Sequence, residues 1–227
     1  YGVPPTEFTW SQRDKDGKVV STDKYTPLSF YNKLWGYDLN NDYVLVMNDP
    51  SREYYKVYQI EYDRHTYDGH DWVYLNLPNE EVKPMLIASL KDSTAMYISC
   101  DVNKFLNRQK GVMDLKNFDY ESLLGVTMTM NKKERIITHA SASSHAMTLI
   151  AVDIDKATSK PTKWMVENSW GKENGFKGNY IMTDEWFNEY MFRFVLNKKY
   201  VPESVAKLLK QKPIKLPAWD PMFAPEE

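Results

Sequence analysis

The sequence predicts an α+β fold built around a mostly antiparallel sheet. Several short segments rich in Tyr, Val and Ile alternate between apolar and polar residues, as half-buried strands do. Other segments have a capping residue followed by an apolar face at helical spacing. The 227 residues are 42% hydrophobic and 26% charged, which is enough for a real core in an ordinary globular protein.

Residues 1–92 are predicted to be an insertion-rich segment with a helix and strands of its own. After a turn in "DKDG", the segment "TPLSFYNKLWG" predicts a helix with Thr26 as N-cap and Gly36 as its stop. Strands are expected in "DYVLVMND", "YYKVYQIEY" and "DWVYLNLP", the last two joined as a hairpin by the loop "DRHTYDGHD". The best amphipathic helix is "NEEVKPMLIASLKD", which Asn79 can cap.

Residues 93–200 are predicted to be β-rich, and residues 201–227 to form a helix and an extended arm. Strands are expected in "TAMYISCDV", "HAMTLIAVDI", "KWMVENSW", "NYIMT" and "FRFVLNKK", with a short helix in "DEWFNEYM". Residues 103–144 are expected to be irregular, with short helices near "NKKERII". A helix in "VPESVAKLLKQ" precedes "KPIKLPAWDPMFAPEE", whose four prolines predict an arm that is neither regular helix nor sheet.

Bulk properties argue against several classes of function. A net charge of −2 gives no support to nucleic-acid or membrane-surface binding, although "KLLKQKPIK" is locally basic. No apolar run approaches the roughly 18 residues that span a bilayer. One Cys excludes an internal disulfide framework. The chain begins without Met and without a signal-peptide pattern, so we expect a fragment, and a secreted or periplasmic full protein is not excluded.

Two segments combine into a candidate cysteine-peptidase site. His145 opens an apolar strand, and Asn168 lies near the end of the next strand. Adjacent antiparallel strands can place the amide oxygen of Asn168 against an imidazole N–H, which fixes the ring's orientation and tautomer. Trp170 would cover that bond from water, and Gly171 allows a bend. Each residue alone is more often structural, and only their order and spacing together are specific.

These motifs carry a resemblance to a known family. "HAMTLIAVD", "KWMVENSWG", "GNYIMTDEWFNEY" and "PIKLPAWDPM" resemble the papain-like cysteine peptidases, in particular the branch of bleomycin hydrolase and aminopeptidase C. The resemblance runs from about residue 4 to the C-terminus. It implies a papain-like fold, mostly the β-barrel half, in which His145 is the catalytic imidazole, Asn168 orients it and Trp170 shields the pair.

The resemblance also implies the properties of the complete enzyme. It would be a cytoplasmic thiol aminopeptidase that acts on peptides, uses no metal or organic cofactor and assembles as a homo-oligomer, a hexamer in the family. The C-terminal arm would enter the cleft, where the carboxylate of Glu227 meets the substrate's α-ammonium group. Without such an arm the enzyme would be an endopeptidase.

The nucleophile is missing from this sequence. The family places its catalytic Cys early, at a helix N-terminus with an upstream Gln, and neither motif occurs here. The single Cys, Cys100, ends a strand and precedes Asp101, whose charge raises a thiol pKa, so we expect a buried structural Cys. The chain therefore reads as the C-terminal half of such an enzyme, inactive without its Cys-bearing half.

The other histidines and the neighbour of Asn168 predict no second site. His65 and His70 match no common metal-ligand spacing and are expected in a solvated loop, as is His139. Glu167 is expected on the opposite strand face from Asn168 and without a catalytic role. A non-catalytic papain-like binding module and a nucleic-acid-binding protein remain as alternatives.

Overall fold

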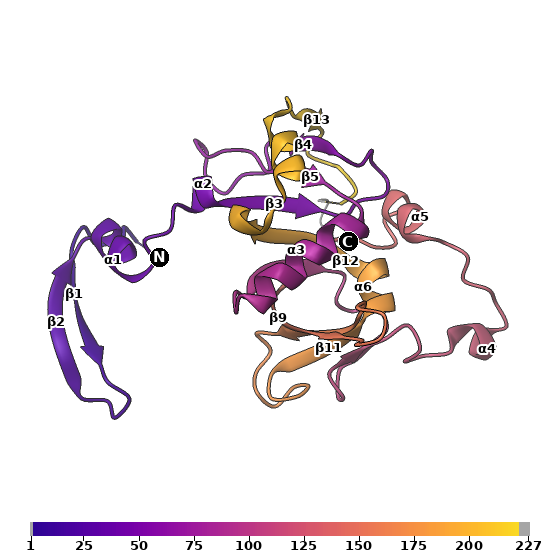
Figure 1. Ribbon diagram of the computed structural model, residues 1–227, viewed down its shortest axis with the longest axis horizontal. Coiled ribbons are helices and arrows are strands. Elements are labelled where there is room, and N and C mark those ends of the chain that lie inside the picture. Colours follow the sequence, from indigo (N-terminus) through magenta and orange to yellow (C-terminus); the bar gives the residue numbers. More distant parts are fainter. Residues whose placement is uncertain (1, 223–227) are drawn as a thin grey trace. The chain divides into compact units, whose positions relative to one another are not determined.

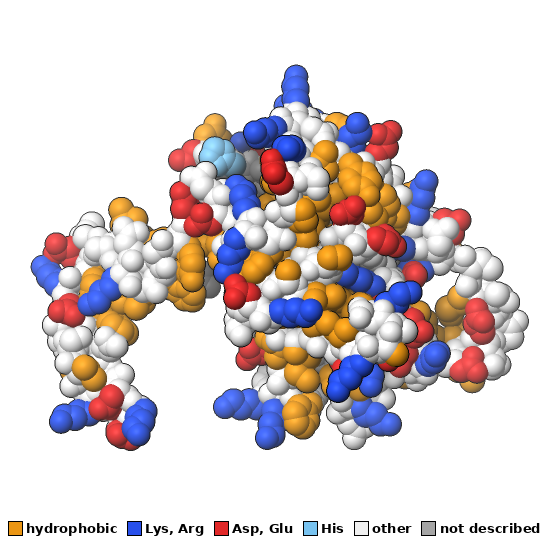
Figure 2. Space-filling view, viewed as in Figure 1, with side chains coloured by type: hydrophobic (Ala, Val, Ile, Leu, Met, Phe, Trp, Pro, Cys, Tyr) orange, Lys and Arg blue, Asp and Glu red, His pale blue; other side chains and the backbone are white. Residues whose placement is uncertain are grey.

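The chain divides between Asp42 and Tyr43 into two compact units, each described here by itself. A computed structural model describes residues 2–222 (Figure 1). The division into segments 1–92, 93–200 and 201–227 stays a prediction. On the face seen in Figure 2, acidic and basic side chains are interspersed. Within residues 2–222, no helix combines the length and apolar character needed to cross a bilayer.

The first unit is a β-hairpin followed by two short helices. Strands β1 (Phe8–Arg13) and β2 (Val19–Tyr25) pair antiparallel on either side of the predicted turn. Helix α1 (Pro27–Leu34) begins as predicted: the Thr26 hydroxyl accepts from the backbone N–H of the third helical residue in a capping box. Helix α2 (Leu39–Asp42) ends the unit.

Aromatic packing holds the first unit together. The ring of Phe30, on α1, meets the rings of Phe8, Trp10 and Tyr25 edge-on, with centroids 5.2, 5.2 and 5.3 Å away. Edge-to-face contacts of this kind are favourable beyond the area they bury. They fasten the helix to one side of the hairpin.

The second unit is organised around one sheet of eleven strands, ordered β13-β4-β5-β3-β12-β6-β9-β10-β11-β8-β7. Most neighbours are antiparallel, and the pairs β3–β5, β4–β13 and β8–β11 are parallel. The strands are β3 (Tyr43–Met47), β4 (Lys56–Ile60), β5 (Val73–Asn76), β6 (Met96–Cys100), β7 (Leu106–Asn107), β8 (Val112–Met113), β9 (His145–Ile154), β10 (Pro161–Glu167), β11 (Asn179–Thr183), β12 (Met191–Asn197) and β13 (Ile214–Leu216).

The α+β class is confirmed, but the barrel is not. Among the described residues no pairing joins the edge strands β13 and β7, so the sheet is open. Closing a barrel requires long, tilted strands that meet edge to edge. Here the two edge strands have three and two residues, too few to form such a seam.

Among the described residues of the second unit, five α-helices pack beside this sheet or connect its strands. The 13-residue α3 buries Val82, Met85 and Leu86, as its apolar spacing predicts. Its N-cap is Pro78, and Asn79 is the first helical residue; the Asn79 side-chain amide donates to the side-chain oxygen of Asn188 at 3.1 Å. The helices are α3 (Asn79–Lys91), α4 (Tyr120–Leu124), α5 (Lys132–Ile137), α6 (Asp184–Tyr190) and α7 (Glu203–Ala206).

The C-terminal segment is more regular than its prolines predict. Ile214–Leu216 forms β13 and pairs in parallel with β4, so the expectation of no sheet is wrong. The prolines flank this strand, and it lies at an edge where one side needs no partner. Beyond it, the buried carboxylate of Asp220 forms an ion pair with Arg52, and Met222 is buried while Trp219 is 77% exposed. The arm is thus docked as far as Met222.

Candidate functional site

His145 stands at the first position of β9, between two other strands. Strand β6 pairs with one edge of β9, and β10 pairs with the other. Met147 and Leu149, two and four residues further along β9, are buried in the core. Because residues two apart share a strand face, the imidazole is attached to a strand that the core holds firmly.

Asn168 follows the last residue of β10 and is 8% exposed. Its backbone N–H donates to the carbonyl of Gly178 at 3.0 Å, which fixes this turn. Its side-chain Oδ1 accepts from the backbone N–H of Ser169 at 2.8 Å and lies 2.9 Å from Nε2 of His145. The bond between Asn168 and His145 that the sequence predicts is therefore present.

The partners of Oδ1 decide the tautomer of His145. A carbonyl oxygen can only accept, so Nε2 of His145 must carry the hydrogen. In the neutral ring Nδ1 is then the nitrogen with a free lone pair. The site therefore presents a basic nitrogen on the side of the imidazole away from Asn168.

Trp170 covers this pair. Its ring lies 4.9 Å from the His145 ring, tilted by 37°, and meets the ring of Tyr180 edge-on at 5.7 Å. The guanidinium of Arg108, from the turn between β7 and β8, lies over the same indole at 4.6 Å. Gly171 takes φ 96°, and a Cβ there would collide with the carboxylate of Glu173.

Arg108 and Tyr180 were not found from the sequence. Arg108 is 37 positions before His145 in the chain, and it reaches Trp170 only because β8 pairs with β11 and β11 with β10. Tyr180 is buried between half-buried neighbours in a strand, a pattern typical of an ordinary core residue. No local spacing connects either residue with the site.

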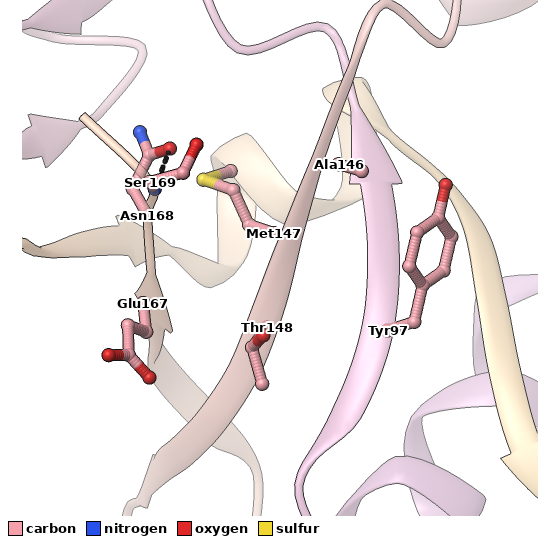
Figure 3. A pocket seen from close by; sticks show the side chains of 7 residues that line it. All are labelled: Tyr97, Ala146, Met147, Thr148, Glu167, Asn168 and Ser169. Carbon is pink, nitrogen blue, oxygen red and sulfur yellow. Dashed lines mark hydrogen bonds between the residues drawn. The ribbon is translucent and has the colours of Figure 1, made fainter. Parts of the chain in front are cut away.

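A cavity of about 350 Å³ lies beside Asn168 (Figure 3). Tyr97, Thr148 and Glu167 line it from three neighbouring strands, and the sheet register places the three in one row. The side chain of Met147 extends toward Asn168 on the opposite side of β9 from Tyr97. The cavity thus offers aromatic, hydroxyl and carboxylate groups next to Asn168.

Cys100 is placed directly opposite His145 in the register of β6 and β9, yet it is fully buried. Burial, followed by the charge of Asp101, raises the pKa of its thiol. A nucleophilic thiol needs the opposite environment, one that stabilises the thiolate. The expectation that Cys100 is a buried core residue is confirmed.

The remaining histidines lie elsewhere. His65 and His70 are exposed in the loop between β4 and β5, and within residues 2–222 no group of three potential metal ligands gathers. His139 is exposed just after α5. Glu227, the residue expected to meet the substrate's amine, lies outside the described residues.

Comparison with known proteins agrees with the fold. The Peptidase C1-like family matches residues 1–223. Bleomycin hydrolase of Homo sapiens is 43% identical, and aminopeptidase C of Lactobacillus delbrueckii subsp. lactis is 38% identical; each alignment covers 98% of this chain and 50% of the relative. The crystal structure of PepW from Lactobacillus rhamnosis HN001 superimposes with a TM-score of 0.91 at 35% identity, over 98% of this chain and 50% of that one.

The chain spans about half the length of the curated relatives it matches. The match nevertheless extends over nearly all of its own residues, the His–Asn pair included. The chain therefore belongs to the Peptidase C1-like family.

Proposed function

We propose that this chain supplies the His–Asn half of the active site of a thiol aminopeptidase, whose nucleophilic Cys lies outside residues 1–227. The observation that carries the proposal is the 2.9 Å contact between Nε2 of His145 and Oδ1 of Asn168 beneath Trp170. The names of the relatives, bleomycin hydrolase and aminopeptidase C, give the reaction class.

In this proposal Nδ1 of His145 accepts the proton of the incoming thiol. The thiolate attacks the carbonyl carbon of the scissile peptide bond, and His145 returns the proton to the leaving amine as the C–N bond breaks. Water then hydrolyses the thioester, with His145 again as base. Asn168 is neutral, so it holds the ring in place while the thiolate and imidazolium balance each other's charge.

The docked arm supports removal of residues one at a time from the N-terminus. Nη2 of Arg193 donates to the carbonyl of Met222 at 3.2 Å. The sheet register aligns Arg193 with Ser99 and Ser99 with Ala146, the neighbour of His145, two strand spacings or about 10 Å away. The five residues after Met222 span up to about 17 Å when extended, enough for Glu227 to approach the cleft.

The full protein's substrates and surroundings belong to the same proposal. The cavity lined by Tyr97, Thr148 and Glu167 would receive part of a peptide substrate. We further propose a homo-oligomer, hexameric as in the resembling family, located in the cytoplasm.

The decisive experiment is a peptidase assay on the full-length protein with fluorogenic aminoacyl amides. His145→Ala should lower kcat/KM by about 10³-fold or more, because the proton acceptor is lost. His139→Ala, an exposed histidine six positions earlier, is the matched control and should keep nearly full activity.

Two outcomes would contradict the proposal. The first is full activity of His145→Ala. The second is substrate binding without turnover by the full-length parent, which would favour the alternative of a non-catalytic binding module. Residues 1–227 alone should give no turnover, since Cys100 is buried.

A further inference from the structure

The segment from residue 121 to 130 is exposed at every position, although half of its residues are large and apolar. Glu121 is its single charged residue. Its five large apolar side chains have exposed fractions from 48 to 77%: Leu123, Leu124, Val126, Met128 and Met130. Contiguous exposed apolar surface of this kind marks a contact site, because a solvated loop of this length is normally polar.

The segment is held in a fixed conformation and is not a loose tether. The Glu121 carboxylate accepts from the backbone N–H of Met128 at 2.6 Å, and Gly125 ends α4 in the left-handed region at φ 64°. On one side the rings of Phe118 and Tyr120 stack at 5.6 Å. In Figure 1, α4 lies at the end of an excursion of the chain away from the sheet.

The other end of the segment is anchored in the core through α5. Lys132 is buried, and its ammonium donates to Oδ1 of Asn48 and to the carbonyl of Met191, both at 2.6 Å. Ile136, one turn later, is 1% exposed. Because α5 is anchored in the core, the apolar side chains of residues 123–130 project from a fixed part of the structure.

A groove runs beneath the excursion. It has a volume of about 470 Å³ and is lined by Phe105, Leu115, Phe118, Tyr120 and Met128, together with the charged residues Lys116, Asp119 and Glu121. The ring of Tyr120 meets that of Phe105 edge-on at 5.8 Å. A groove of this size takes several apolar side chains from a partner surface.

The anchored end leads directly into the catalytic strand. The Ser141 hydroxyl donates to Asp101 at 2.7 Å, and the backbone N–H of Ser144 donates to the carbonyl of Cys100 at 3.1 Å. His145 is the next residue. Any nucleophile must come within about 3–3.5 Å of the imidazole, so the part of the protein that carries it must lie alongside this connection.

We propose that residues 118–130 and the groove beneath them are the docking surface for the Cys-bearing half of the same polypeptide. The inference rests on the proposed function. Two observations identify this occupant: the chain spans half the length of its relatives, and the site around His145 lacks a usable thiol. Covering the five large apolar side chains would hold the nucleophile's helix against His145.

The test is photo-crosslinking within the full-length protein. A benzophenone amino acid replaces Leu123, and in the matched control it replaces Leu28, an equally exposed leucine (77 and 69%) of the first unit. Samples mixed from isotopically light and heavy copies distinguish contacts within one chain from contacts between chains. We expect the product at position 123 to join peptides outside residues 1–227, with both partners of one isotope.

Three results would overturn the docking proposal. They are crosslinks at position 123 that join light with heavy chains, products that lie entirely within residues 1–227, and a yield at position 123 no higher than at position 28. The experiment is repeated with His145→Ala, which removes the proposed activity but leaves the apolar segment intact. If position 123 crosslinks to the other half but the parent protein has no peptidase activity, the docking proposal stands and the aminopeptidase proposal is rejected.

Discussion

At the scale of single residues, Trp170 controls the access of water to the bond between His145 and Asn168. The indole packs on the imidazole at 4.9 Å, and Arg108 in turn packs on the indole at 4.6 Å. A hydrogen bond is stronger and longer-lived where water is excluded. Arg108 therefore acts on the site indirectly, by holding the Trp170 indole in position.

Trp170→Ala should expose the Nε2–H of His145 to solvent. We expect its proton resonance to be sharp in the parent chain, to broaden through faster exchange in Arg108→Ala, and to disappear in Trp170→Ala. NMR of residues 1–227, with only four histidines, can follow this signal. Trp219→Ala, at a 77% exposed indole, serves as the control and should leave the resonance unchanged. An equally sharp signal in all four proteins would reject the shielding role.

Cys100 should not react with thiol reagents in the folded chain. Its sulfur is buried, and that burial raises the pKa of the thiol. A disulfide reagent such as Ellman's should modify almost none of the native protein and one thiol per chain after unfolding. Rapid labelling of the native chain would show that Cys100 is accessible and would reopen its candidacy as nucleophile.

The residues of the site could be predicted from the sequence where they are local. His145 and Asn168 belong to strands whose apolar spacing is clear, so their encounter follows from pairing adjacent strands. Arg108 could not be predicted, because it reaches Trp170 through two further strand pairings that no local pattern specifies. The position of Glu167 in the cavity could not be predicted either, because the residues that line this cavity come from three strands that only the sheet register brings together.

At the scale of elements, α5 is fastened by a lysine that has almost no access to water. Burial lowers the pKa of Lys132 to about 7, while its hydrogen-bond partners, Asn48 and the carbonyl of Met191, are uncharged. Glu189 and Asp49 favour the charged form of Lys132, whereas Arg135 and Lys83 oppose it. Protonation of the buried Lys132 therefore lowers the stability of the folded state.

The sign of this dependence follows from proton binding. Between pH 7 and the ordinary lysine pKa near 10.4, the unfolded chain binds a proton at Lys132 that the folded chain does not, so Lys132 makes folding more favourable as pH rises. We expect the free energy of unfolding of the parent to gain up to about 1.4 kcal/mol per pH unit relative to Lys132→Met. Urea unfolding at several pH values measures the difference, and parallel curves would contradict it.

Most helices and strands were predictable, because their caps and apolar spacing are local. Thr26 caps α1 as expected, and α3 buries its predicted apolar face. The hairpin β1–β2 was missed except for its turn, since its strands expose most residues and lack a clear alternation. β13 was missed for two reasons: it has only three residues between two prolines, which predict irregular structure, and its partner, β4, is remote in sequence.

At the scale of the whole molecule, the C-terminal arm is held against the sheet as far as Met222. Asp220 and Met222 are each 1% exposed, and Arg52 and Arg193 hold them. If the arm blocks one end of the cleft, removing the residues after Trp219 from the full-length enzyme should convert it from an aminopeptidase to an endopeptidase. Mass spectrometry of the products from an N-terminally blocked peptide measures this change.

The control for the truncation is Trp219→Ala, which alters an exposed residue of the same arm and should keep the parent's specificity. The blocked peptide should be resistant to the parent and to this control, and should be cleaved internally by the truncated enzyme. If the truncated enzyme still leaves the blocked peptide intact, the arm does not set the specificity.

The central position of β12 has a consequence for biosynthesis. This strand pairs with β3 on one edge and with β6 on the other, and within residues 2–222 no other strand joins those two parts of the sheet. A ribosome releases β3, β4 and β5 long before it completes β12. The edge of β3 that will pair with β12 therefore has no partner while more than half of the chain is still being made. The sheet can close up only after β12 has been made, and chaperones that cover exposed strand edges should therefore engage the nascent chain before residue 197 emerges.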